Sequence, residues 1–176
     1  MMNPQFTESI TRAFEKAVSV AKEAKNSELS DTHLLKALLL DPESYFVVLL
    51  KELQIDLNNL SQALEKEISR LPVIETGEYQ INPSSRLQKL IEKASNWAQK
   101  WGDSFLSGDH FLLAMIENNT EPLTTLIRAK KLTLKEVADL IQKIRGGRHM
   151  DSPTAEASVK ALEKYGKNLT ALAKEG

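Results

Sequence analysis

The chain contains no cysteine, and this absence excludes several classes of site at once. A disulfide scaffold, a cysteine-ligated metal and a thiol nucleophile all require at least one cysteine. The absence also suits a reducing compartment, and we expect a cytoplasmic location. The N-terminal stretch from Met1 to Phe6 lacks the basic-then-apolar order of a signal peptide.

Neither a strong net charge nor a long apolar run is present. The formal net charge is -1, so there is no bulk attraction to phosphate backbones or anionic lipid. The longest apolar runs, such as Phe46 to Leu50, are far too short to span a bilayer. With 41% hydrophobic and 27% charged residues the chain has the composition of a globular protein. We expect neither a nucleic-acid partner nor a membrane partner.

Catalytic motifs are also missing. The seven glycines form no G-x-x-x-x-G-K-[ST] or G-x-G-x-x-G loop that would hold a phosphate, and no G-x-S-x-G elbow occurs. The three histidines, at positions 33, 110 and 149, lack the spacing of metal ligands. The sequence therefore predicts a chain that is not an enzyme, with no metal site and no cofactor.

What the chain does contain is an internal repeat. HLLKA at 33–37 and HFLLA at 110–114 match at an offset of 77 residues, from 33 to 110. The same offset pairs further apolar positions without a gap: Ile10 with Leu87, Phe14 with Ile91, Phe46 with Leu123, Leu50 with Ile127, Leu60 with Val137, and Leu64 with Ile141. The shared feature is apolar periodicity, which indicates a duplicated core and not a duplicated active site.

The helix signals predict an all-α fold of eight helices in two pseudo-symmetric four-helix repeats. We expect repeat 1 at 1–72, a partly extended linker at 73–82, repeat 2 at 83–146, a flexible, solvated linker at 147–157 and one further helix at 158–176. The expected helix starts are Thr7, Ser30 or Asp31, Pro42, Asp56, Asn82-Pro83, Ser107, Pro122 and the Thr133–Glu136 capping box, and Gly146 ends the eighth helix.

The last predicted helix carries an apolar stripe of Leu162, Tyr165, Leu169 and Leu172. The repeats offer this stripe no obvious partner, so we expect it to dock onto a later part of a longer chain.

Two motifs and the tail resemble a known family. LSDTHLL at 29–35 and KWGDSFLSGDHFLLA at 100–114 resemble the paired Clp N-terminal repeats. The tail ALEKYGKNLTALAKEG at 161–176 is similar to the segment that leads into the first ATPase domain of ClpB-type AAA+ disaggregases. The resemblance covers nearly the full length, and the tail separates ClpB from ClpA and ClpC types.

The resemblance implies a mobile module that captures unfolded or aggregated polypeptide for an ATP-driven hexameric ring. ATP and Mg would then belong only to the missing ATPase domains. The ring of its own full-length protein would be the second partner, and we expect the isolated domain to be monomeric.

The resemblance also implies a set of substrate-binding residues. Three are polar, namely Thr7, Asp103 and Asp109, and each has an equally good structural explanation, because Thr7 and Asp109 suit helix caps and Asp103 follows Gly102 in a turn. His110 stands where family members often carry an apolar groove residue. For His33 and His110 we expect local hydrogen bonds in the first turn of a helix.

Aromatic residues supply the expected apolar wall, at Trp97, Trp101 and Phe105. The first repeat has Val20 and Ala24 where the second has its two tryptophans, so the shared core does not require that bulk. Core packing and a binding surface are therefore both open. The groove would form where the helix 84–101 and the loop 102–110 meet the N-terminal residues.

Other functions are possible for the same sequence. A ClpA- or ClpC-like domain would dock a folded adaptor protein through polar contacts. A chain that occurs alone would regulate the full assembly. An enzyme is the most distant alternative.

Overall fold

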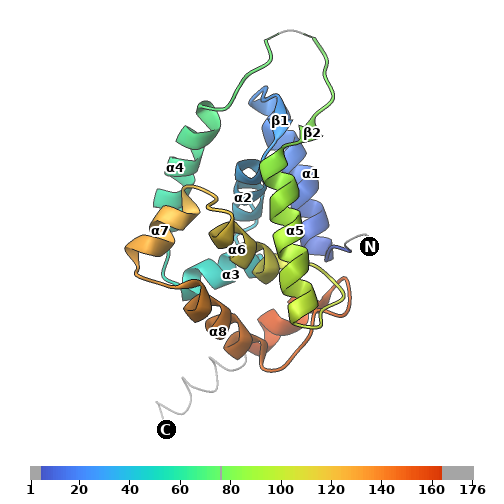
Figure 1. Cartoon of the computed structure of the whole chain (residues 1–176), viewed down its shortest axis with the longest axis vertical. Coiled ribbons are helices and arrows are strands. Elements are labelled where there is room, and N and C mark those ends of the chain that lie inside the picture. The colour runs from blue at the N-terminus through green and yellow to red at the C-terminus, as the bar shows by residue number, and fades with distance from the viewer. Residues whose placement is uncertain (1–4, 76, 164–176) are drawn as a thin grey trace.

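The computed structural model of the chain describes residues 5–75 and 77–163 and is shown in Figure 1. The helices of the first half are α1 Glu8–Glu23, α2 Asp31–Leu39, α3 Tyr45–Glu52 and α4 Leu57–Ser69. Those of the second half are α5 Ser85–Lys100, α6 Gly108–Glu117, α7 Leu123–Ala129 and α8 Leu134–Arg145. Another helix occupies 155–163. The predicted all-α fold of two four-helix repeats and a further helix is confirmed.

Most of the predicted helix starts are confirmed. Thr7 and Asp56 accept backbone N–H bonds at the starts of α1 and α4, and Thr133 with Glu136 forms the capping box of α8. Gly146 follows α8 in the left-handed region, at φ 58°, as expected for a residue that ends a helix.

Two predicted starts are wrong by a few residues. α3 begins after Ser44 and not at Pro42, because the Ser44 hydroxyl accepts the Val47 N–H, which a proline side chain cannot do. α5 begins after Ser84, whose hydroxyl accepts the Leu87 N–H. The residues before it, Asn82–Pro83, form the short strand β2 instead.

The two repeats share one core. α1 packs against α2 and α5 against α6, and α3 and α2 of the first repeat contact α6 and α5 of the second. Phe46 of α3 and Phe111 of α6 are fully buried in the same cluster as Leu34 and Leu112. One face of each helix is therefore removed from water, which is the dominant favourable term in folding.

The segment between the repeats is hydrogen-bonded to the first repeat. β2 pairs in parallel with β1 (Glu28–Leu29), and Val73 forms an isolated bridge with Asn26. The Tyr79 hydroxyl donates to the Asn26 carbonyl at 2.8 Å. These contacts agree with the expectation of a partly extended segment, whereas the predicted domain boundaries stay predictions.

The segment at 147–157, expected to be a solvated linker, packs onto the protein. Met150 is fully buried, Ala155 and Glu156 are also buried, and the helix begins at 155 and not at 158. The low number of apolar residues was misleading, because the few that are present pack into the core and backbone hydrogen bonds and the Glu156 carboxyl supply further contacts. Of the predicted C-terminal stripe, Tyr165, Leu169 and Leu172 lie outside the described residues.

Within residues 5–75 and 77–163, none of the helices combines the length and apolarity needed to cross a bilayer.

A buried carboxylate joins the two repeats. Asp31 at the start of α2 accepts hydrogen bonds from Thr120 at 2.7 Å and from Arg86 at 3.1 Å, both in the second repeat. Burial alone would raise the pKa of Asp31, but hydrogen bonds from Thr120, Ser30 and Arg86 hold it below its ordinary value.

We predict that Asp31→Ala lowers the free energy of unfolding by about 2–4 kcal/mol, because the buried Thr120 hydroxyl loses its acceptor and Arg86 loses its ion-pair partner. Urea denaturation measures this. Asp139→Ala is the matched control, since Asp139 pairs with Lys135 on the surface at 3.2 Å and is expected to contribute about 0.5 kcal/mol or less. Equal losses of stability in Asp31→Ala and Asp139→Ala would contradict the claim that Asp31 joins the two repeats.

Candidate binding site

The structure brings the N-terminal residues and the α5–α6 connection together. The Leu106 N–H donates to the Gln5 carbonyl at 2.8 Å, and the Thr7 N–H donates to the Leu106 carbonyl at 3.1 Å. Trp97 and Trp101 lie at the end of α5, and Asp109 and His110 lie in the first turn of α6. The loop 102–110 therefore meets the N-terminal residues as expected, whereas the predicted groove at this place stays a prediction.

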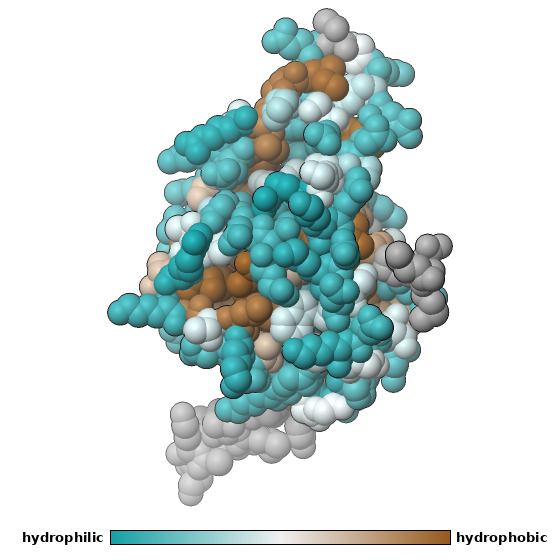
Figure 2. Space-filling model, viewed as in Figure 1, coloured by the Kyte–Doolittle hydropathy of each residue, from teal (hydrophilic) through white to brown (hydrophobic). Residues whose placement is uncertain are grey.

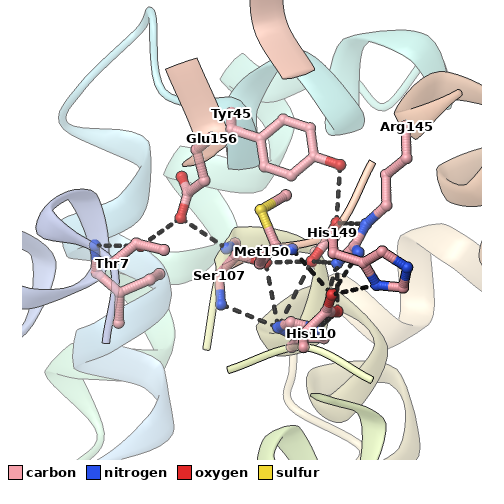
Figure 3. A network of polar contacts seen from close by, with 12 residues as sticks. Thr7, Tyr45, Ser107, His110, Arg145, His149, Met150 and Glu156 are labelled. Atoms are coloured by element: carbon pink, nitrogen blue, oxygen red, sulfur yellow. Dashed lines mark hydrogen bonds and ion pairs between the residues drawn. The ribbon is translucent and has the colours of Figure 1, made fainter. Parts of the chain in front are cut away.

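The four polar residues of the predicted site are enclosed. Thr7, Asp109 and His110 are fully buried, and the side chain of Asp103 has no exposed area. Figure 3 shows Thr7 and His110 among the hydrogen-bonded and ion-paired side chains, and Asp103 and Asp109 both pair with Arg145. In this arrangement their side chains present no surface to a ligand, so they position the backbone around the site. Ligand contact by any of the seven residues stays a prediction.

One guanidinium stands at the centre of this network. Arg145, at the end of α8, contacts Asp109 Oδ2 through Nε at 2.8 Å, Asp103 Oδ1 through Nη1 at 3.0 Å and Asp103 Oδ2 through Nη2 at 2.9 Å. The Tyr45 hydroxyl donates to Asp109 Oδ2 at 2.8 Å. Planar, multidentate pairing of this kind suits arginine better than lysine.

The network holds both carboxyl groups ionised. Burial raises the pKa of each, but for Asp109 the neighbouring His110 and Arg145 outweigh it, and for Asp103 the hydrogen bonds from His110, Arg145 and the Met150 N–H do so. Both pKa values lie below the ordinary value of 3.8. The pKa of Arg145 is raised, because its two carboxylate partners outweigh its own burial.

The two helix-start histidines act as capping groups. The Ser30 N–H donates to His33 Nδ1 at 2.8 Å, and the Ser107 N–H donates to His110 Nδ1 at 2.9 Å. Because Nδ1 accepts in both, Nε2 carries the proton and donates, to Asn26 Oδ1 at 2.8 Å and to Asp103 Oδ2 at 2.7 Å respectively. The expectation of local hydrogen bonds is confirmed.

The histidine sites of the two repeats differ in charge. At the offset of 77 residues, Asp103 stands where the first repeat has Asn26, and Arg145 stands where it has Ile68. Burial lowers the pKa of His33 to about 4, and the charge of Asp31 only partly opposes this. The first repeat therefore has an uncharged pair, His33 and Asn26, and the second has a cluster of charged side chains around Arg145.

Sequence reasoning missed three members of the cluster, Arg145, Tyr45 and Glu156. For Arg145 a signal existed, because a charged residue replaces an apolar one at a repeated core position. No comparable signal marks Tyr45 or Glu156.

The tryptophans lie at the boundary of the core. Both are partly buried, and their ring centroids are 5.5 Å apart in an edge-to-face arrangement. Trp101 packs on His110 at 5.8 Å between ring centroids, and the Arg145 guanidinium lies 4.8 Å from the Trp101 ring. The Trp97 indole N–H donates to the Glu117 carboxylate. Each indole packs against the core and also keeps some exposed area, so the tryptophans are neither fully buried nor fully on the surface. Whether they bind a ligand stays a prediction.

Partly exposed phenylalanines lie beside the same connection. Phe105 packs partly buried against the core. Phe6 and Phe14 stack at 5.0 Å between centroids, and Phe14 meets the buried Phe111 edge-on at 5.9 Å. Phe6 also bridges to Leu106 through the backbone. The sequence analysis did not select Phe6 and Phe14, although they add apolar surface next to the predicted site.

Apolar side chains also reach the surface elsewhere. Figure 2 shows them in the area where α6, α7 and α8 lie in Figure 1, within a mostly hydrophilic face. The partly buried apolar residues on these helices are Ile116, Leu126, Leu134, Ala138, Leu140 and Ile144.

In the described part of the chain, no group of three or more metal-ligating side chains comes together.

Comparison with known proteins identifies close relatives. The family model of the Clp repeat (R) N-terminal domain matches residues 5–130. The chaperone protein ClpB of Chlamydia pneumoniae is 41% identical over 172 residues, which cover 98% of this chain and 20% of that protein. The chain thus spans about a fifth of the length of this relative.

Solved structures agree on the fold. The Hsp104 N-terminal domain from Candida albicans has a TM-score of 0.73 at 22% identity, covering 86% of this chain and 99% of that one. A ClpV N-domain in complex with a VipB peptide has a TM-score of 0.60 at 18% identity, covering 81% and 94% respectively.

We predict that Arg145→Ala lowers the free energy of unfolding by about 3–5 kcal/mol, because two buried carboxylates lose their counter-charge. Urea denaturation followed by tryptophan fluorescence measures this. Arg148→Ala, at an exposed position three residues later, is the control and is expected to change stability by less than about 0.5 kcal/mol. A loss below about 1 kcal/mol for Arg145→Ala would rule out the central role of the guanidinium.

The lowered pKa of Asp103 also predicts a pH dependence. A carboxyl whose folded pKa lies below its unfolded value stabilises the fold above the unfolded value of 3.8, and that stability is lost as the pH falls toward the folded pKa. The free energy of unfolding of the wild type exceeds that of Asp103→Asn, and this difference should therefore decrease by about 1 kcal/mol from pH 7 to pH 3. Urea denaturation at both pH values, with Asp139→Asn as control, checks this, and a gap that does not change with pH refutes it.

Proposed function

The chain belongs to the Clp repeat N-terminal domain family, and we propose that it captures unfolded or aggregated polypeptides for a ClpB-type protein disaggregase. On this proposal it performs no catalysis and binds no nucleotide or metal. The ATP-driven hexameric ring, with its ATP and Mg, belongs to the part of the relatives that the chain does not span. A cytoplasmic location and a monomeric isolated domain are part of the same proposal.

The observation that carries the proposal is that three aromatic side chains stay partly exposed at the α5–α6 connection, next to a buried polar network. Trp97, Trp101 and Phe105 are partly exposed, while Arg145 and its two carboxylates hold the backbone beneath them. Unfolded chains vary in sequence, so a surface that binds many of them needs apolar area and few fixed polar demands. Aromatic side chains supply such area at a small cost in conformational entropy.

The fold offers a precedent for peptide binding. The ClpV N-domain, which shares this fold, is known in complex with a VipB peptide. We infer that an extended or helical segment of an unfolded client lies along the end of α5 and the α5–α6 connection. Phe6 and Phe14 would extend the same apolar surface through their contact with Leu106 and Phe111.

We predict that Trp97→Ala and Phe105→Ala each weaken binding of an unfolded polypeptide about tenfold, because truncation removes apolar contact area. Fluorescence anisotropy with labelled, reduced and carboxymethylated lactalbumin measures the affinity. Leu40→Ala is the matched control, since Leu40 is an exposed apolar residue of the first repeat, and it should leave the affinity unchanged.

Two results would reject the proposal. One is equal affinity of the wild type and both aromatic variants. The other is equal binding of native, folded lactalbumin, which would favour a domain that docks folded adaptors.

A further inference from the structure

Residues 147–163, here called the C-terminal strap, cover the junction between the N-terminal segment and the α5–α6 connection. The Met150 carbonyl accepts the N–H groups of Ser104 and Phe105, both at 3.0 Å, and the Met150 N–H donates to Asp103 Oδ1 at 2.8 Å. The Glu8 N–H donates to the Pro153 carbonyl at 2.9 Å. One short segment thus bonds to two chain regions about 100 residues apart in sequence.

The buried carboxyl of Glu156 in the strap adds to these contacts. Glu156 is 5% exposed, and its Oε1 accepts from the Thr7 hydroxyl and from the Gly108 N–H at 3.2 Å. Gly108 is the first residue of α6, where free N–H groups favour a negative charge. Figure 3 shows Glu156 between Thr7 and the α6 start.

The groups that face Glu156 do not neutralise it. Asp109 on α6 repels its charge, and Tyr45 on α3 lies close enough for Glu156 to help raise the pKa of that phenol. Arg145 on α8 is engaged by Asp103 and Asp109. From the described part of the N-terminal segment, the neutral hydroxyls of Thr7 and Ser9 reach it.

We propose that the C-terminal strap is a releasable device: neutral Glu156 holds it docked, and ionisation of Glu156 loosens it together with the N-terminal segment and the α5–α6 connection. This inference stands on the strap contacts and on the burial of Glu156 beside Asp109, and it does not depend on the proposed function. Because the strap carries the backbone bonds of Phe105, its release would also alter the predicted binding surface.

The direction of the pH effect follows from burial. Burial raises the pKa of Glu156 from 4.5 to about 6, with Asp109 adding to the rise and the hydrogen bonds from Thr7, Gly108 and Ser9 opposing it. A carboxyl with a raised pKa in the docked state favours docking at low pH, and this advantage is lost as the pH rises through 6. The pKa difference between 4.5 and about 6 corresponds to a change of about 30-fold in the equilibrium constant for docking between low and high pH.

Amide hydrogen exchange of the whole chain tests the device. The reporters are the amides of Glu8, Ser104 and Phe105, whose acceptors lie on the strap, and the reference is the Ile55 amide, which bonds to Leu50 in the first repeat. After correction for intrinsic exchange, reporter protection should be about eightfold higher at pH 5 than at pH 7.5. Glu156→Gln should abolish this ratio, and Asp151→Asn, which alters an exposed acid of the strap, should keep it.

A second variant tests docking independently of pH. Val159 is fully buried, so a carboxylate at this position should undock the strap. Val159→Asp should therefore lower the protection of the reporter amides at least tenfold, while the Ile55 amide keeps its wild-type protection. The proposal is overturned if Glu156→Gln keeps the wild-type pH ratio, or if the reporters stay protected in Val159→Asp. Equal loss at Ile55 would also overturn it, since the strap would then not be a separate unit.

Discussion

The pairing of Arg145 with Asp103 and Asp109 is the constraint on which the second repeat depends. These groups are almost completely removed from water, so each charge is tolerated only because the others are present. The same three residues tie the end of α8 to the α5–α6 connection and to the start of α6. The partly exposed Trp101 rests on this cluster through its contacts with Arg145 and His110. The network therefore links the stability of the domain to the shape of the surface that we propose binds polypeptides.

The duplication explains how such a network can arise without disturbing the fold. Both repeats start their second helix with a serine whose backbone N–H binds a histidine three residues on. In the first repeat the histidine bonds to the amide of Asn26, and Ile68 stands at the position equivalent to Arg145, whereas the second repeat uses a carboxylate and a guanidinium. The same serine–histidine hydrogen bond thus accompanies a neutral site in one repeat and a charged site, next to two tryptophans, in the other.

Apolar periodicity and capping residues made the eight helices predictable, because both signals are local in sequence. Thr7, Asp56 and Thr133 cap helices as expected. The site was only partly predictable. Its residues stay predictions as ligand contacts, and the surroundings of Asp109 and Thr7 include Arg145 and Glu156, which contact them from 36 and 149 residues away. The strap was misjudged for a related reason: only a few apolar residues, Met150, Ala155 and Val159, dock it, and backbone hydrogen bonds and Glu156 add to their contacts.

The most direct test of the central claim is an NMR titration of labelled protein with reduced, carboxymethylated lactalbumin and, separately, with the native folded form. The account predicts chemical-shift changes that cluster at Trp97, Trp101 and Phe105 with the unfolded form only. The α4 helix, on the far side of the first repeat, should serve as an unchanged reference. Changes spread evenly over both repeats, or confined to residues remote from the α5–α6 connection, would contradict the claim that this surface captures unfolded chains.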